Sequence, residues 1–204
     1  MDLATNRALY RSPGFHANST KPFHAYIAPL LDQRKPPPEP GGAIVSEFLG
    51  EGYWPRPVKT MVEEILRDEL RNSRIYAGLT KTPTSSDLII EPALTVLHGA
   101  WERRAYPNYG GRTYAVVALH IKIYAPADAA GKRRVWLNKE FREFVGSEFI
   151  MSTPPNIQQL TGVALSRTMR KLLDAVYTAD GRKVREATTT NKSDKSDSDK
   201  AEKK

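Results

Sequence analysis

Four histidines are the first residues to consider for metal binding or proton transfer. They are His16, His24, His98 and His120. No two of them have a ligand spacing such as H-x-x-x-H, and no Asp or Glu stands beside them at metal-ligand spacing. His98 and His120 are expected on neighbouring strands and could approach each other, but two histidines on a sheet face are the simpler interpretation. The sequence therefore predicts no metal site.

Other motifs that carry chemistry are missing from the sequence as well. The chain has no cysteine, which excludes disulfides, thiolate catalysis and cysteine-based metal sites. Its double glycines, Gly41-Gly42 and Gly110-Gly111, belong to no nucleotide-binding loop, and there is no G-x-S-x-G motif. Glu140 and Glu143 could form a carboxylate pair, but the basic residues around them favour a solvated, charged strand end. We therefore expect neither enzymatic activity nor a bound cofactor.

One stretch combines residue types that are common in binding sites. Residues 101–112 are expected to form a hairpin tip that carries six candidate partner-binding residues: Trp101, Arg103, Arg104, Tyr106, Tyr109 and Arg112. Trp, Tyr and Arg are enriched at the centres of protein interfaces, and they also stack on bases or contact phosphates. The alternative is structural: Trp101 and Tyr114 would pair across the strands while the arginines are solvated.

Three consecutive antiparallel strands are expected to position this tip, at about 87–101, 112–125 and 133–144. The middle strand gives the clearest pattern, because one parity is apolar: Ala115, Val117, Leu119, Ile121 and Ile123. The other parity is mixed and includes Tyr114 and His120. Alternate side chains of a strand point to opposite faces, so this strand is expected to have one core face and one mixed face.

The rest of the chain supplies helices and shorter elements. We expect a first strand at 23–31, a proline-rich loop at 35–42, a short strand at 43–49, and helices at 58–70 and 154–178. Ser152 or Thr153 is expected to cap the second helix, with Pro154 in its first turn. Together these elements predict an α+β domain of order β-α-β-β-β-α. An antiparallel sheet of about four strands would carry two helices on one face.

The two ends differ from this domain in composition. We expect an extended N-terminal arm at 1–21, a single domain at 22–180 and a disordered, charged tail at 181–204. Tyr10 and Phe15 are the expected docking points of the arm. The tail has almost no large apolar residue and carries +3 of the formal net charge of +8. The remaining charge permits a polyanionic partner without requiring one.

A resemblance to a known family rests on four segments. They are Leu31-Asp32-Gln33-Arg34 after the first strand, Tyr53-Trp54-Pro55-Arg56-Pro57 before the first helix, Ser73-Arg74-Ile75-Tyr76, and Ser86-Asp87-Leu88-Ile89-Ile90. With the final helix, they make the chain similar to bacterial envelope lipoproteins of the ABC-transport auxiliary component type. More loosely, it resembles LptE-like and TolB amino-terminal domains. The similarity covers about residues 22–177.

The resemblance implies a non-enzymatic periplasmic domain that is held at the outer membrane by an acylated cysteine. Its partners would be components of an envelope transport or assembly complex. The sequence departs from the family because residues 1–20 include no apolar signal-peptide core and no lipobox cysteine. It also has no apolar run long enough to span a membrane.

Two function hypotheses follow. The first is an envelope interaction module, in which the hairpin tip and the proline-rich loop contact protein partners. The second, less favoured hypothesis is a cytoplasmic nucleic-acid-binding protein. It would use basic residues on one sheet face: Arg103, Arg104, Arg112, Lys122, Arg133 and Arg134.

Overall fold

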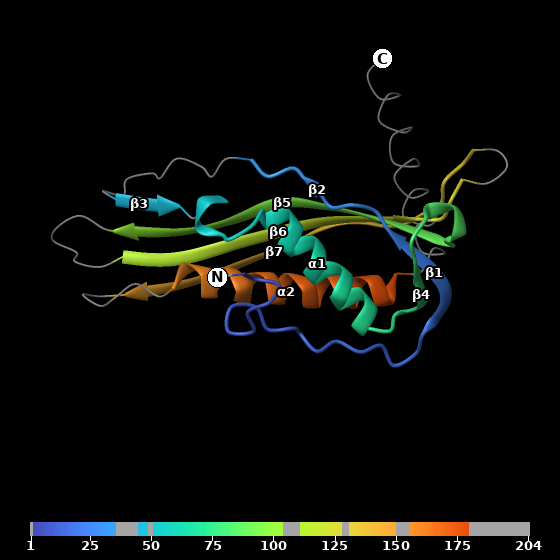
Figure 1. Ribbon diagram of the computed structural model, residues 1–204, viewed down its shortest axis with the longest axis horizontal. Helices are drawn as coiled ribbons and strands as arrows, with labels where there is room; N and C mark the ends of the chain where they lie inside the picture. The colour runs from blue at the N-terminus through green and yellow to red at the C-terminus, as the bar shows by residue number, and fades with distance from the viewer. Residues whose placement is uncertain are drawn as a thin grey trace, which may run out of the picture.

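The computed structural model describes residues 2–35, 45–48, 51–103, 111–127, 131–149 and 156–179. Seven strands and two α-helices form within them (Figure 1). The strands are β1 (Lys21–Ile27), β2 (Leu31–Asp32), β3 (Val45–Phe48), β4 (Tyr76–Thr80), β5 (Leu88–Arg103), β6 (Gly111–Tyr124) and β7 (Val135–Phe149). The helices are α1 (Val58–Asn72) and α2 (Ile157–Thr178), with short 3₁₀ turns at Glu51–Tyr53 and Pro83–Ser85.

The sheet is mixed, so the predicted fold class is wrong. Its strand order is β4-β1-β5-β6-β7, and β2 and β3 also pair with β5. The β4-β1-β5 side is parallel, whereas β5-β6-β7 is antiparallel as expected. The chain leaves β1, passes through α1 and returns as β4 beside β1, which is the crossover that parallel neighbours require. Alternation within one strand does not reveal which neighbour it pairs with, so the sequence could not show this arrangement.

The core lies between the helices and one face of the sheet. The predicted alternation of β6 is confirmed, since Ala115, Val117, Leu119, Ile121 and Ile123 are all 0% exposed. Both helices contribute to the same buried cluster, and α2 runs along β6 and β7 (Figure 1). Each helix contributes to the cluster through an apolar stripe. The stripe of α1 comprises Val58, Met61, Val62, Ile65, Leu66 and Leu70.

The helix ends follow from local chemistry. Asn156 caps α2, because its side chain accepts hydrogen bonds from the backbone N–H groups of Gln158 and Gln159. The expected cap at Ser152 or Thr153 is therefore wrong, and those two residues lie outside the described parts of the chain. At the end of α1, the Ser73 hydroxyl donates to the Leu70 carbonyl, and Arg74 takes a φ of 53°. This left-handed residue turns the chain from α1 into β4.

Residues 2–20 pack along the two helices and contribute to the core (Figure 1). Leu3, Leu9, Tyr10 and Phe15 are buried. A Cβ at Gly162 of α2 would lie 1.7 Å from the Leu9 carbonyl oxygen, so the N-terminal segment (residues 2–20) touches this helix at a point where only glycine fits. The proline-rich tract from 36 and the tail from 181 lie outside the described residues. No described helix combines the length and the apolar character that crossing a membrane requires.

Candidate protein-interaction site

The face of the sheet that points away from the helices carries a separate small hydrophobic cluster. Its buried members are Ala100, Tyr114 and Val116, with Val96 packed against them. Neither helix contributes a residue to this cluster. Tyr114 and Val116 of β6 thus belong to a small apolar cluster on the other face of the sheet, to which no helix residue contributes.

An aromatic pair stands on this surface. The ring of Tyr114 stacks on Phe144 of β7 with ring centroids 5.6 Å apart, and His98 of β5 packs edge-on against Tyr114 at 6.2 Å. Phe144 remains 57% exposed, one of the largest exposures of an apolar side chain among the described residues. We call His98, Tyr114, Phe144, Val96 and Val116 the aromatic patch. A solvent-facing ring held rigidly on a strand is typical of a protein-binding surface.

Charged groups fix the rim of the aromatic patch. Glu102 accepts hydrogen bonds from the Tyr114 hydroxyl at 3.0 Å and from Arg112 Nε at 2.5 Å. Burial and the neighbouring Glu102 carboxylate raise the pKa of Tyr114 above its ordinary value. Burial, together with the positive charge of Arg142, lowers the pKa of His98. The lowered pKa favours the neutral form of His98, which suits an apolar patch.

The structure separates the candidate residues at the hairpin. Arg112 lies at the rim of the aromatic patch, whereas Trp101 is paired with Thr113 and shares the helix-facing side of the sheet. Tyr114 is paired with Ala100, so the alternative account, in which Trp101 and Tyr114 pair across the strands, is wrong. Arg103 ends β5 opposite Gly111, and its side chain is not described. Arg104, Tyr106 and Tyr109 lie outside the described residues.

His98 lies far from His120, and Glu140 and Glu143 lie on opposite faces of the sheet. His98 is opposite Val116, so His98 and His120 are offset by four residues along the sheet, about 13 Å at the rise of a strand. Glu140 accepts from Thr95 on the helix-free face, whereas Glu143 forms an ion pair with Lys171 of α2 on the other face. No group of three metal-ligating side chains occurs within the described ranges.

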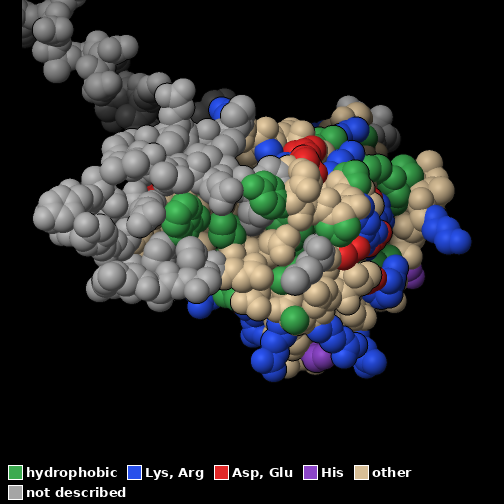
Figure 2. Space-filling model, turned by 60° about the vertical axis from the view of Figure 1, so that its left-hand side comes forward, with side chains coloured by type: hydrophobic (Ala, Val, Ile, Leu, Met, Phe, Trp, Pro, Cys, Tyr) green, Lys and Arg blue, Asp and Glu red, His purple; other side chains and the backbone are tan. Residues whose placement is uncertain are grey.

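Among the cations proposed for nucleic-acid binding, Arg112 and Lys122, whose side chains the structure describes, lie far apart on β6. Arg112 is at one end of β6, and Lys122 is ten residues further on, about 33 Å away. Lys122 and Arg133 lie over the ring of Tyr124, 5.5 and 4.8 Å from its centroid. Carboxylates on the same face, including Glu102 at one end, interrupt the positive charge. In Figure 2, Lys and Arg side chains gather along the lower edge of the molecule, and on the right-hand side they lie next to Asp and Glu side chains.

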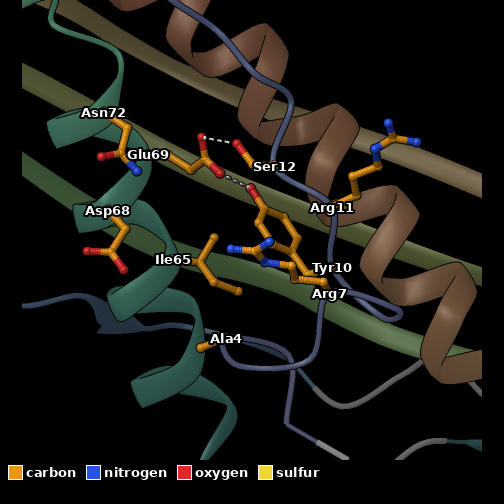
Figure 3. Close-up of a pocket in the computed structure, with 9 residues that line it drawn as sticks. All are labelled: Ala4, Arg7, Tyr10, Arg11, Ser12, Ile65, Asp68, Glu69 and Asn72. Carbon is orange, nitrogen blue, oxygen red and sulfur yellow. Dashed lines mark hydrogen bonds between the residues drawn. The ribbon is translucent and has the colours of Figure 1, made fainter.

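A pocket of about 460 Å³ lies between the N-terminal segment and α1 (Figure 3). At its base the buried Glu69 carboxylate accepts hydrogen bonds from the hydroxyl groups of Tyr10 at 2.8 Å and Ser12 at 3.0 Å. Arg7 and Arg11 are exposed at its edge, and Arg11 points away from α1. Both oxygens of Glu69 are engaged by the N-terminal segment, so the three residues fasten this segment to the domain.

Replacing Tyr10 by Phe tests this fastening. The substitution keeps the ring and removes the donor to Glu69, so we expect a loss of about 1.5–3 kcal/mol in unfolding free energy at pH 7. Burial and the Glu69 carboxylate raise the pKa of Tyr10 well above its ordinary value of 10.0. The stabilisation is therefore complete below pH 10 and declines as the pH rises beyond it. In urea unfolding, the difference in unfolding free energy between the wild type and Tyr10→Phe should be smaller at pH 11 than at pH 7. An equal difference at both pH values would contradict this assignment.

Comparison with known proteins identifies the fold and no more. No protein-family model matches the sequence, and no curated protein matches it. Among solved structures, protein XCC0632 of family DUF330 from Xanthomonas campestris has a TM-score of 0.54 at 13% identity, over 87% of this chain and 95% of that chain. The chain therefore shares its fold with a bacterial protein.

Two further bacterial structures are less similar. The hypothetical protein CT253 from Chlamydia trachomatis has a TM-score of 0.49 at 9% identity, over 78% of this chain and 98% of that chain. A homolog of the neuraminyllactose-binding hemagglutinin from Helicobacter pylori has a TM-score of 0.41 at 7% identity, over 87% of this chain and 94% of that chain.

Proposed function

We propose that the chain is a non-enzymatic accessory module of a bacterial envelope transport or assembly machine, and that it acts through protein contacts. The observation that carries this proposal is the ring of Phe144, which is 57% exposed and stacks on the buried Tyr114 on a sheet face to which neither helix contributes a residue of the cluster. Large aromatic side chains offer contact area at a low cost in side-chain entropy, and the polar rim of Glu102 and Arg112 can give orientation.

The proposed location is the periplasm, with attachment to the outer membrane through a lipid anchor. The bacterial fold shared with XCC0632 is compatible with this location, and the resemblance of the four sequence segments favours it. The cytoplasmic nucleic-acid-binding alternative has less support, because acidic groups on the same face interrupt its cations.

Site-specific photocrosslinking tests the proposal. A benzoylphenylalanine at position 144 would place the reactive ketone on the exposed ring of the aromatic patch. In living bacteria we expect it to form an adduct with one discrete envelope protein. Replacing Tyr114 by Ala removes the ring under Phe144 and should lower the adduct yield severalfold while the domain remains folded, which circular dichroism can verify.

Position 138 provides the matched control. Asn138 is exposed, lies on the same strand and faces the same side, but it is outside the aromatic patch. Adducts between two copies of the chain are recognised by mass and counted separately. Equal capture of other proteins from positions 138 and 144, or an adduct confined to cytoplasmic proteins, would show that the proposal is wrong.

A further inference from the structure

The outer edge of β7 is long and paired on one side only. β7 spans 15 residues, and its ladder with β6 runs from Phe149 opposite Gly111 to Val135 opposite Tyr124. Among the described residues, no strand pairs with the opposite edge of β7. The backbone N–H and C=O groups of such an edge can pair with another extended chain. The side chains along the edge then decide which chain fits.

The charges near the middle of β7 have an unusual order. Phe141 is flanked by Glu140 and Arg142, and beyond these by Lys139 and Glu143. One residue away from Phe141, Glu140 on one side has the opposite charge to Arg142 on the other. Two residues away, Lys139 has the opposite charge to Glu143. A strand with this order is complementary to itself when it runs antiparallel to a second copy. An edge protected by lysines alone would instead repel another copy in every register.

We propose that two copies of this chain associate through their β7 edges, antiparallel and with the two-fold axis at Phe141. Glu140 would then face Arg142 of the second copy, and these two exposed residues provide the main contact. Lys139 would face Glu143 of the second copy, whose carboxylate also forms an ion pair with Lys171 of its own α2. Residues directly opposite each other in an antiparallel pair share a face, so these contacts form on both sides of the sheet. The two sheets would join into one continuous sheet.

The same charges select this register against its neighbours. Moving the two-fold axis to Glu140 places two glutamates opposite each other, and moving it to Arg142 does the same with two arginines. Both shifted pairings keep the helices on one side, so they are the natural competitors, and like charges opposite each other are destabilising. The register centred on Phe141 is the one in which every central charge is matched.

The helix side of the β7 edge carries an open groove. A groove of about 460 Å³ runs between β7 and α2, and its lining includes Phe141, Lys171 and Asp174. Lys171 and Asp174 are exposed, and Val163, on the same side of α2, is 40% exposed. Because α2 lies over β6 and β7, joining two β7 edges brings the two α2 helices side by side, and each helix would cover the groove of the other copy.

Charge reversal gives a test that does not depend on the identity of any other partner. The full-length chain is examined by sedimentation equilibrium over a wide range of concentrations, and the wild type is expected to form dimers. Glu140→Arg leaves two arginines to face each other across the interface, and Arg142→Glu leaves two glutamates. Each variant alone should dimerise at least about tenfold more weakly, because two opposite-charge pairs become like-charge pairs. Both positions are exposed, so circular dichroism and thermal melting should match the wild type.

Mixing the two variants is the decisive measurement. An equimolar mixture restores arginine against glutamate at both contacts, and it should therefore form a heterodimer. The double variant Glu140→Arg with Arg142→Glu should recover self-association for the same reason. A wild type that stays monomeric at the highest soluble concentration would overturn the proposal, as would single variants that dimerise normally or a mixture that remains monomeric.

Discussion

Leu119→Asp is expected to prevent the domain from folding. Leu119 is 0% exposed at the middle of β6, between Leu94 of β5 and Phe141 of β7. A carboxylate in this position would have no partner, and burying it costs several kcal/mol against a total stability of about 5–15 kcal/mol. We expect an insoluble protein, or a soluble one whose circular dichroism signal shows no cooperative melting.

The control places the same carboxylate on the surface of the neighbouring strand. Asn138 is exposed and lies opposite Lys122, so Asn138→Asp should leave the melting temperature close to that of the wild type. If Leu119→Asp melts cooperatively near the wild-type temperature, the assignment of the odd-numbered face of β6 to the core is wrong.

Gly162→Ala is expected to detach the N-terminal segment from α2. The new Cβ would lie 1.7 Å from the Leu9 carbonyl oxygen and 2.5 Å from its carbon, and neither atom belongs to a flexible side chain that could move aside. Either the backbone of the segment shifts or α2 moves, and overpacking of this kind typically costs about 1–3 kcal/mol. We expect a lower melting temperature and rapid cleavage by trypsin after Arg7 and Arg11, because their side chains are exposed and only the packing of their neighbours Leu9 and Tyr10 holds the backbone in place in the wild type.

Gly52→Ala is the matched control, because a Cβ at Gly52 would meet no atom within 4 Å. This variant should resist trypsin at Arg7 and Arg11 as well as the wild type does. A Gly162→Ala protein that is equally resistant, and equally stable, would disprove the close contact between the two segments.

The sequence predicted best those elements whose pattern is local and repeated. The apolar residues of α2 keep helical spacing for five turns, and the odd-numbered residues from Ala115 to Ile123 in β6 are all apolar, so the type of each element follows from periodicity alone. β4 was missed because Tyr76–Thr80 is only five residues long and contains Gly78, which leaves too little alternation to recognise. Its parallel pairing with β1 depends on the crossover through α1, which is a tertiary property.

The candidate site was less accessible to sequence reasoning. Tyr114 was placed correctly on the mixed face of β6, but Phe144 was taken as the last residue of its strand, whereas β7 continues to Phe149. The stacking of the two rings depends on the register of β6 against β7, in which Tyr114 is opposite Gly146 and Phe144 is opposite Val116. Gly146 has no side chain that would separate the two rings. The sequence alone did not show that Gly146 lies opposite Tyr114, because this depends on the register.

The docked N-terminal segment also constrains how the chain reaches its native state. The Ser166 hydroxyl of α2 donates to the Arg11 carbonyl, joining residues 155 positions apart. The N-terminal segment therefore completes its contacts only after α2, at the other end of the domain, has been made and has packed on the sheet. Contacts of such long sequence separation are associated with slow folding, since the loop they close must be ordered first. The segment is thus expected to be among the last parts to gain protection from hydrogen exchange during refolding.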